Sequence, residues 1–300
     1  MTVSGYETGM RMLTLLVLLC PLVASAQPAK KPVVFTAMGC GPYDAAAEEA
    51  LKRFIALENR SRTSSFMIHC GDIVTGKNKH WPESQYAKVA DILTEENAIP
   101  TFIVPGDNEW NDQADPDRGW AYWSKHFMLF DAKWPAVAPV QRQEGRKENF
   151  AFVKDGVLFI GINKVGGLVH DAEEWHQRLT DNGRWVEEQM TKHREQVHSA
   201  AIFAQAKASG SAAPGNSSVF VDSLKISAKK FAKPILYLHA DGHKWYVIKG
   251  DWAPNITHVQ MDLISAKFPP LQVIVTGNPE EPFKFDRRLN NKAWGTAESN

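Results

Sequence analysis

Three short apolar stretches decide the architecture of this chain: Val33-Val-Phe-Thr-Ala37, Ser65-Phe-Met-Ile-His69 and Thr101-Phe-Ile-Val104. Short runs rich in β-branched and aromatic residues, bounded by Gly or Pro, are typical of buried strands. Segments 43–59 and 83–96 lie between them and are predicted helices, the first because its apolar residues recur at helical spacing. This β-α-β-α-β order predicts a parallel sheet with helices packed on its faces.

The second half of the chain predicts further strands and a long helix. Phe150-Ala-Phe-Val153 and Val157-Leu-Phe-Ile-Gly-Ile162 flank an Asp-Gly turn, which indicates a hairpin. Asp171 is expected to cap a helix that extends to about Glu195. Further strands are expected at 200–204, 235–238, 245–248 and 271–275, and the Gly/Ser/Ala/Pro-rich stretch 209–218 is expected to be a loop. No linker divides the chain, so residues 27–300 are predicted to form one layered α/β domain.

Composition excludes several classes of protein. The 300 residues are 44% hydrophobic and 23% charged, which argues against disorder and coiled coil. Lys and Arg number 34 and Asp and Glu also number 34, so no basic field is present to hold nucleic acid or a membrane surface. Three cysteines are too few for a disulfide scaffold.

Residues 1–26 have the pattern of a secretory signal peptide. Arg11 precedes an apolar run over 12–23, which ends in Ala24-Ser-Ala26. The run is too short for a membrane-spanning helix, which needs about 20 apolar residues. An N-terminal core helix is the alternative interpretation. Cleavage after Ala26 predicts a secreted or periplasmic protein, and no second long apolar run follows that could span a membrane.

Each of the three N-terminal strands is followed by a loop in which Gly precedes Cys or Asp. These loops contain Gly39-Cys40, Gly71-Asp72 and Gly106-Asp107. In open α/β sheets, ligands bind beyond the carboxyl ends of the strands. The three loops are therefore expected to converge on one site.

Four motifs together resemble the calcineurin-like metallophosphoesterases, in a divergent exported branch. In order, they are Phe35-Thr-Ala-Met-Gly-Cys-Gly-Pro-Tyr43, His69-Cys-Gly-Asp72, Val104-Pro-Gly-Asp-Asn-Glu-Trp110 and His239-Ala-Asp-Gly-His243. The resemblance implies a four-layer α/β/β/α sandwich with two mixed β-sheets. It also implies hydrolysis of a phosphate mono- or diester by water activated at one or two divalent metal ions.

The resemblance assigns metal ligation to four carboxylate and imidazole positions. Asp72 matches the bridging carboxylate of the family, and Asp107 stands where the family has Asn. His243 matches the second His of the family's Gly-His-x-His motif, and Asp241 replaces the first. Carboxylates at these positions favour Mg²⁺, Mn²⁺ or Ca²⁺.

Other positions depart from the family pattern. The opening Asp-x-His becomes Cys40-Gly-Pro42, where a Cys40 thiolate could ligate Zn²⁺ or Fe. Asn108 replaces the catalytic His and cannot protonate a leaving group, so His239 is a candidate replacement acid. Gln205 replaces a lone ligand His and offers a weak neutral ligand. The chain thus keeps a plausible second-metal set (Asp72, Asp107, Gln205, Asp241) and a reduced first set (Cys40, Asp72, His243), with Mn, Mg, Fe or Zn as the candidate metals.

The two cysteines beyond the signal sequence leave three alternatives open. Cys40 and Cys70 both lie at the ends of strands that are expected to be neighbours. They could form a disulfide in an oxidising compartment, Cys40 could ligate metal, or both could be inert buried thiols.

Two functions remain in competition. One is a metal-dependent phosphoesterase acting on a small-molecule or macromolecular phosphate ester. The other is a catalytically impaired relative that binds a phosphorylated ligand or a partner in the same cleft. Clustered carboxylates raise one another's pKa unless a cation lies between them, so both interpretations require a metal.

Overall fold

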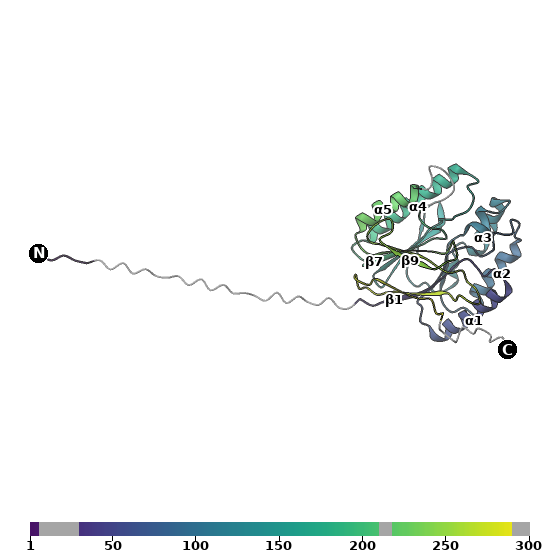
Figure 1. The fold of residues 1–300 in the computed structure, drawn as a ribbon, viewed down its shortest axis with the longest axis horizontal. Helices are drawn as coiled ribbons and strands as arrows, with labels where there is room; N and C mark the ends of the chain where they lie inside the picture. The colour runs from purple at the N-terminus through teal and green to yellow at the C-terminus, as the bar shows by residue number, and fades with distance from the viewer. Residues whose placement is uncertain (6–29, 210–217, 290–300) are drawn as a thin grey trace.

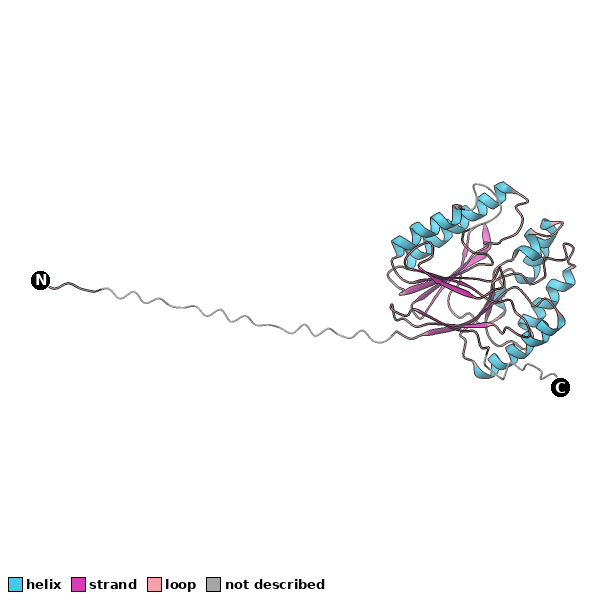
Figure 2. Cartoon of the chain, in the orientation of Figure 1, coloured by secondary structure: helices cyan, strands magenta, loops and turns pink. Residues whose placement is uncertain are grey.

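Two stacked β-sheets form the centre of the molecule, and helices cover their outer faces (Figures 1 and 2). This computed structural model describes residues 1–5, 30–209 and 218–289. The predicted signal cleavage site and most of the predicted loop 209–218 lie outside these residues. The layered α/β class with two mixed sheets is confirmed, whereas the assignment of 27–300 to a single domain stays a prediction.

The five-stranded sheet contains the three N-terminal strands in parallel. Its order is β12 (Phe283–Asp286), β11 (Leu271–Val275), β1 (Val33–Met38), β2 (Met67–His69) and β3 (Thr101–Ile103). The connections from β1 to β2 and from β2 to β3 are helices α1 (Ala45–Ser61) and α2 (Glu83–Thr94), as predicted. The carboxyl ends of β1, β2 and β3 therefore share one edge of the sheet.

The seven-stranded sheet has a parallel centre and antiparallel margins. Its order is β4 (Gln141–Gln143), β5 (Arg146–Lys154), β6 (Val157–Gly161), β7 (Ser199–Phe203), β8 (Ile235–His239), β10 (Ile256–Gln260) and β9 (Tyr246–Lys249). Asp155 and Gly156 turn the β5–β6 hairpin with φ values of 47° and 77°. Positive φ at both residues is what a two-residue turn between twisted strands requires.

The sequence predicted only some of the outer helices and marginal strands. Helix α4 (Ala172–His193) begins at Asp171, whose side chain accepts hydrogen bonds from two main-chain N–H groups of the first turn. Its apolar residues at helical spacing, Trp175, Leu179, Val186 and Met190, are buried. Helices α3 (Pro116–Phe127) and α5 (Val219–Phe231) and strands β4, β10 and β12 were not predicted. The three strands are only 3, 5 and 4 residues long, which leaves little pattern to detect.

Aromatic rings fill the space between the two sheets. Phe66 lies at their centre and is fully buried. Its ring stacks on Phe35 at 5.1 Å and meets Phe159 edge-on at 4.9 Å. Because Phe66 comes from one sheet layer and Phe159 from the other, this contact joins the layers.

Removing the Phe66 ring should therefore cost substantial stability. We expect Phe66→Ala to lower the free energy of unfolding by about 3–5 kcal/mol, the usual cost of a large cavity in a tightly packed core. Urea denaturation measures this change in the free energy of unfolding. Ile226→Ala on the outer face of α5 is the control, since that side chain is 56% exposed. A loss in Phe66→Ala no larger than in the control would contradict this account of the core.

Candidate metal centre

Loops from both sheets bring three different ligand types together. Cys40 follows β1, Asp72 follows β2 and His243 follows β8. One ligand atom of each, a sulfur, an oxygen and a nitrogen, lies within 4.8 Å of the other two. The Cys40 thiol donates to Oδ2 of Asp72 at 3.3 Å. Cys40 and Asp72 are buried and His243 is exposed, so the group opens to solvent on the His243 side.

Glycines allow the two acidic loops to touch main chain to main chain. A Cβ on Gly71 would lie 2.5 Å from the nitrogen of Gly106, and a Cβ on Gly106 would lie 2.1 Å from the nitrogen of Asp72. No side chain fits at such distances. The Gly-Asp pairs read from the sequence are therefore required by this contact, which brings Asp72 beside Asp107.

Three candidate ligands have a left-handed backbone. Cys40, Asp72 and His243 have φ values of 53°, 61° and 63°. Residues with a Cβ are uncommon in this region, and such strain concentrates at binding and active sites.

Glu109 fixes the loop contact and was missed by the sequence analysis. Its Oε1 accepts from the main-chain N–H groups of Gly106 at 2.6 Å and Asp72 at 3.1 Å. The Tyr86 hydroxyl donates to the Glu109 carbonyl. An acidic residue three positions after Gly106, within the third motif, was the available signal. Tyr43, at the end of the first motif, was also missed, and its ring lies 6.0 Å from that of His243.

Gln205 bridges the two aspartates through its amide nitrogen. Nε2 donates to Oδ2 of Asp72 and to Oδ1 of Asp107, both at 3.1 Å. Its oxygen, Oε1, accepts from the Gly166 N–H at 2.7 Å. The atom that could ligate a metal is therefore turned away from the carboxylates, and this arrangement does not fit the predicted role of Gln205 as a ligand.

Asp241 joins the acidic group from the far side. A Cβ on Gly166 would lie 3.0 Å from Oδ2 of Asp107 and 3.3 Å from Oδ2 of Asp241, so both carboxylates border this glycine. The Asp241 N–H donates to the Gln205 carbonyl at 2.9 Å. The structure thus brings together the carboxylates of the second predicted set, but with an amide N–H₂ between Asp72 and Asp107.

Burial gives these acids unusual proton affinities. Desolvation, and next the charge of Glu109, raise the pKa of Asp72 to about 7. Desolvation and Asp72 raise the pKa of Asp107 well above its ordinary range. Burial and Asp72 raise the pKa of the Cys40 thiol as well. A cation beside these groups would favour their ionised forms. A thiolate, a carboxylate and an imidazole suit Zn²⁺, so Cys40, Asp72 and His243 fit a metal ion.

The two predicted catalytic residues have different surroundings. The Asn108 main-chain N–H donates to Oδ1 of Asp72 at 3.4 Å, so this residue borders the site. His239 is buried, and its Nε2 lies 2.8 Å from Nε2 of His258 and 3.3 Å from the Tyr246 hydroxyl. Nε2 of His239 is therefore already directed at two partners, and this geometry gives no support to a role as proton donor.

Cys40 and Cys70 are both free and buried. Cys40 donates to Asp72, whereas the Cys70 thiol interacts with the main chain of Ala204. The two sulfurs therefore have separate partners. The disulfide alternative is not the one that the structure adopts, and the ligand alternative for Cys40 fits its geometry.

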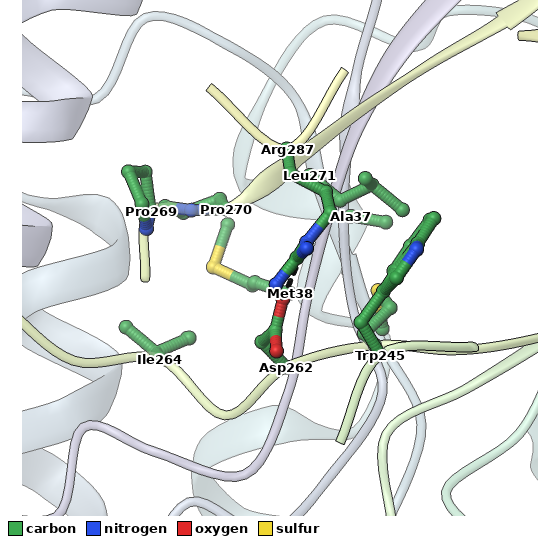
Figure 3. A pocket seen from close by; sticks show the side chains of 10 residues that line it. Ala37, Met38, Trp245, Asp262, Ile264, Pro269, Pro270, Leu271 and Arg287 are labelled. Atoms are coloured by element: carbon green, nitrogen blue, oxygen red, sulfur yellow. Dashed lines mark hydrogen bonds and ion pairs between the residues drawn. The ribbon is translucent and has the colours of Figure 1, made fainter. Parts of the chain in front are cut away.

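A small pocket lies beside the end of β1 (Figure 3). Met38, Trp245 and Ile264 are among its lining residues, and Arg287 crosses it to Asp262 with an Nε–Oδ2 distance of 2.9 Å. None of the candidate ligands lines it.

Comparisons with known proteins identify the fold. No family model matches the sequence, and no curated protein matches it. Among solved structures, the chain resembles a dimetal phosphatase from Danio rerio, with TM-score 0.55 and 10% identity over 84% of this chain and 98% of that one. It also resembles GAP50, the anchor in the inner membrane complex of Plasmodium, with TM-score 0.50 and 12% identity over 85% and 88%. The chain has the calcineurin-like metallophosphoesterase fold that its motifs predict. Within the described residues, no helix has the length and apolar character needed to cross a membrane.

Glu109 should make the metal-free protein less stable as pH rises. Burial raises its pKa from 4.5 to about 8. The folded state therefore binds this proton more tightly than the unfolded chain, and the resulting stability is complete below about pH 4.5 and lost as pH rises through about 8. Glu109→Gln keeps the acceptor oxygen and has no proton to lose. In chelator-treated protein, its free energy of unfolding relative to wild type should rise by about 1–3 kcal/mol between about pH 5 and about pH 9.

Urea denaturation across this pH range measures the difference. Glu188→Gln, at an exposed position of α4, is the control and should show none. A constant difference between Glu109→Gln and wild type would show that Glu109 titrates normally in the fold.

Proposed function

We propose that this protein hydrolyses a phosphate mono- or diester with one divalent metal ion held by Cys40, Asp72 and His243. The observation that carries the proposal is the meeting of three ligand atoms of these residues within 4.8 Å, at the end of strands where such folds bind ligands. Three protein ligands leave coordination positions for water and substrate. The fold shared with a dimetal phosphatase supports the same chemistry.

Soft sulfur in the ligand set favours Zn²⁺ or Fe²⁺ over Mg²⁺ and Mn²⁺. When bound, such an ion polarises a phosphoryl oxygen and lowers the pKa of a water molecule. Residues around the ion orient the Asp72 carboxylate. Gln205 and the Asn108 N–H hold the two oxygens of Asp72, and Glu109 fixes the loop on which Asp72 lies. Exposed His243 marks the side from which substrate enters. If the N-terminal segment directs export as predicted, the substrate is a secreted or periplasmic phosphate ester.

A catalytically impaired binding protein is the second candidate, and Gln205 favours it. Its amide nitrogen donates to Asp72 and Asp107 together, in the space between the two carboxylates where a second cation would bind. Hydrolysis that depends on two ions is lost in that arrangement, whereas one ion and an open cleft still suffice to bind a phosphorylated ligand.

Asp72→Asn should remove the metal from this centre. The substitution deletes the buried charge and keeps the side-chain shape. Loaded with Co²⁺, the wild-type protein should show a thiolate-to-cobalt absorption band from Cys40, and Asp72→Asn should lose that band together with the hydrolysis of an aryl phosphate. Asp91→Asn, at an exposed position of α2, should keep both. An undiminished band in Asp72→Asn would refute the ligand assignment.

Gln205→His should restore a second ion. A neutral imidazole nitrogen can ligate a metal ion, whereas an amide N–H₂ group cannot. We expect elemental analysis to find one more ion per chain than in wild type and kcat/KM for aryl phosphates to rise about tenfold. Gln205→Asn is the control and should do neither. If neither wild type nor Gln205→His hydrolyses mono- or diesters with Zn²⁺, Fe²⁺ or Mn²⁺, the binding function is the correct one.

A further inference from the structure

Three polar side chains meet on the outer side of the seven-stranded sheet. Nε2 of His239 lies 2.8 Å from Nε2 of His258. The Tyr246 hydroxyl lies 3.3 Å from the first nitrogen and 3.2 Å from the second. The three atoms form a nearly equilateral triangle, which we call the His-His-Tyr cluster.

Strand register places the cluster on one face of the sheet. His239 on β8 and Tyr246 on β9 both pair with Gln260 of β10, and His258 is two residues from Gln260. All three side chains therefore point the same way. Tyr237, two residues before His239, belongs to the core under α4 and α5, whereas Leu238 belongs to the core between the sheets. The cluster is thus on the helix-covered side, outside the space between the sheets.

Aspartate and aromatic groups fix the rings in place. Nδ1 of His258 lies 2.7 Å from Oδ2 of Asp251. A carboxylate at Nδ1 holds the proton there and leaves the lone pair of Nε2 directed at the other two members of the cluster. The Trp252 ring covers His258 at 4.3 Å, and Tyr237 meets Trp252 edge-on at 5.3 Å. This is the arrangement of a metal-binding histidine with its carboxylate partner.

The spacing of the triangle matches a tetrahedral ion. With bonds of about 2.0–2.1 Å to nitrogen or oxygen, two ligand atoms of tetrahedral Zn²⁺ lie about 3.3 Å apart. The edges of the triangle are 2.8, 3.2 and 3.3 Å. His239 is 1% exposed and His258 2% exposed, and Tyr246 is partly open to solvent.

We propose that His239, His258 and Tyr246 bind a Zn²⁺ ion, with Asp251 supporting His258 and a water molecule at the fourth position beside Tyr246. The site is distinct from the centre at Cys40, Asp72 and His243 and shares no ligand with it. Its ion would fasten edge strand β9 to β8 and β10.

The experiment uses the full chain carrying Asp72→Asn, in which the first centre is disabled. Calorimetric titration with Zn²⁺ should give one ion per chain, and Co²⁺ should give visible d–d bands without a thiolate band. Adding His258→Gln should abolish binding. Tyr246→Phe keeps the ring and should weaken binding about tenfold or more, and Asp251→Asn should weaken it by about 10–100-fold. His80→Gln removes an exposed histidine and is the control.

Thermal unfolding is a second, independent measure of Zn²⁺ binding. Zn²⁺ should raise Tm in the Asp72→Asn background and in the Tyr246→Phe variant at higher concentration, but not after His258→Gln. His243→Ala, at an exposed position, replaces Asp72→Asn as the background if that variant does not fold. Failure of the background protein to bind Zn²⁺, or equal affinity after His258→Gln, would show that the cluster is only a hydrogen-bonded pair of core histidines. Either result leaves the proposed hydrolysis at the first centre untouched.

Discussion

A main-chain contact between two glycine-containing loops organises the candidate centre. Gly71 and Gly106 let the ends of β2 and β3 approach until no Cβ fits between them, and the buried carboxylate of Glu109 joins the two loops by accepting an N–H from each side. This contact forces Asp72 and Asp107 into the same low-dielectric space. Two acids so placed must share protons, hydrogen-bond donors or a cation, and every other feature of the centre is a response to that requirement.

The chain meets the requirement in two ways on the two sides of Asp72. On one side, Cys40 and His243 offer sulfur and nitrogen beside the carboxylate, which suits an ion. On the other side, Gln205 supplies a neutral donor to both acids and has its own oxygen satisfied by Gly166. The geometry therefore favours the set that the sequence pattern made the weaker one, because a list of ligand types does not show which atom of an amide faces the acids.

Short sequence patterns predicted the parts of the structure that depend on residues close together in the chain. The alternation of β1 to β3 with α1 and α2, the Asp155-Gly156 turn and the Asp171 cap all follow from short patterns, and strand ends correctly predicted that Cys40 and Asp72 meet. Strand β10 was missed because His258 interrupts its apolar pattern. The cluster of His239, Tyr246 and His258 has no motif, since it arises only when edge strand β9 pairs with β10 and β10 in turn pairs with β8.

The segment between β8 and β9 gives the molecule a property that neither group of ligands has alone. His239 and Tyr246 stand at its two ends, and His243 lies between them. Eight residues, 239–246, therefore carry proposed ligands for two separate ions. Ordering of this segment by one ion reduces the conformational entropy that binding of the other must overcome. Reciprocity then requires that binding of either ion increase the affinity of the protein for the other ion by the same factor. The segment is thus a thermodynamic link between the open face and the helix-covered face.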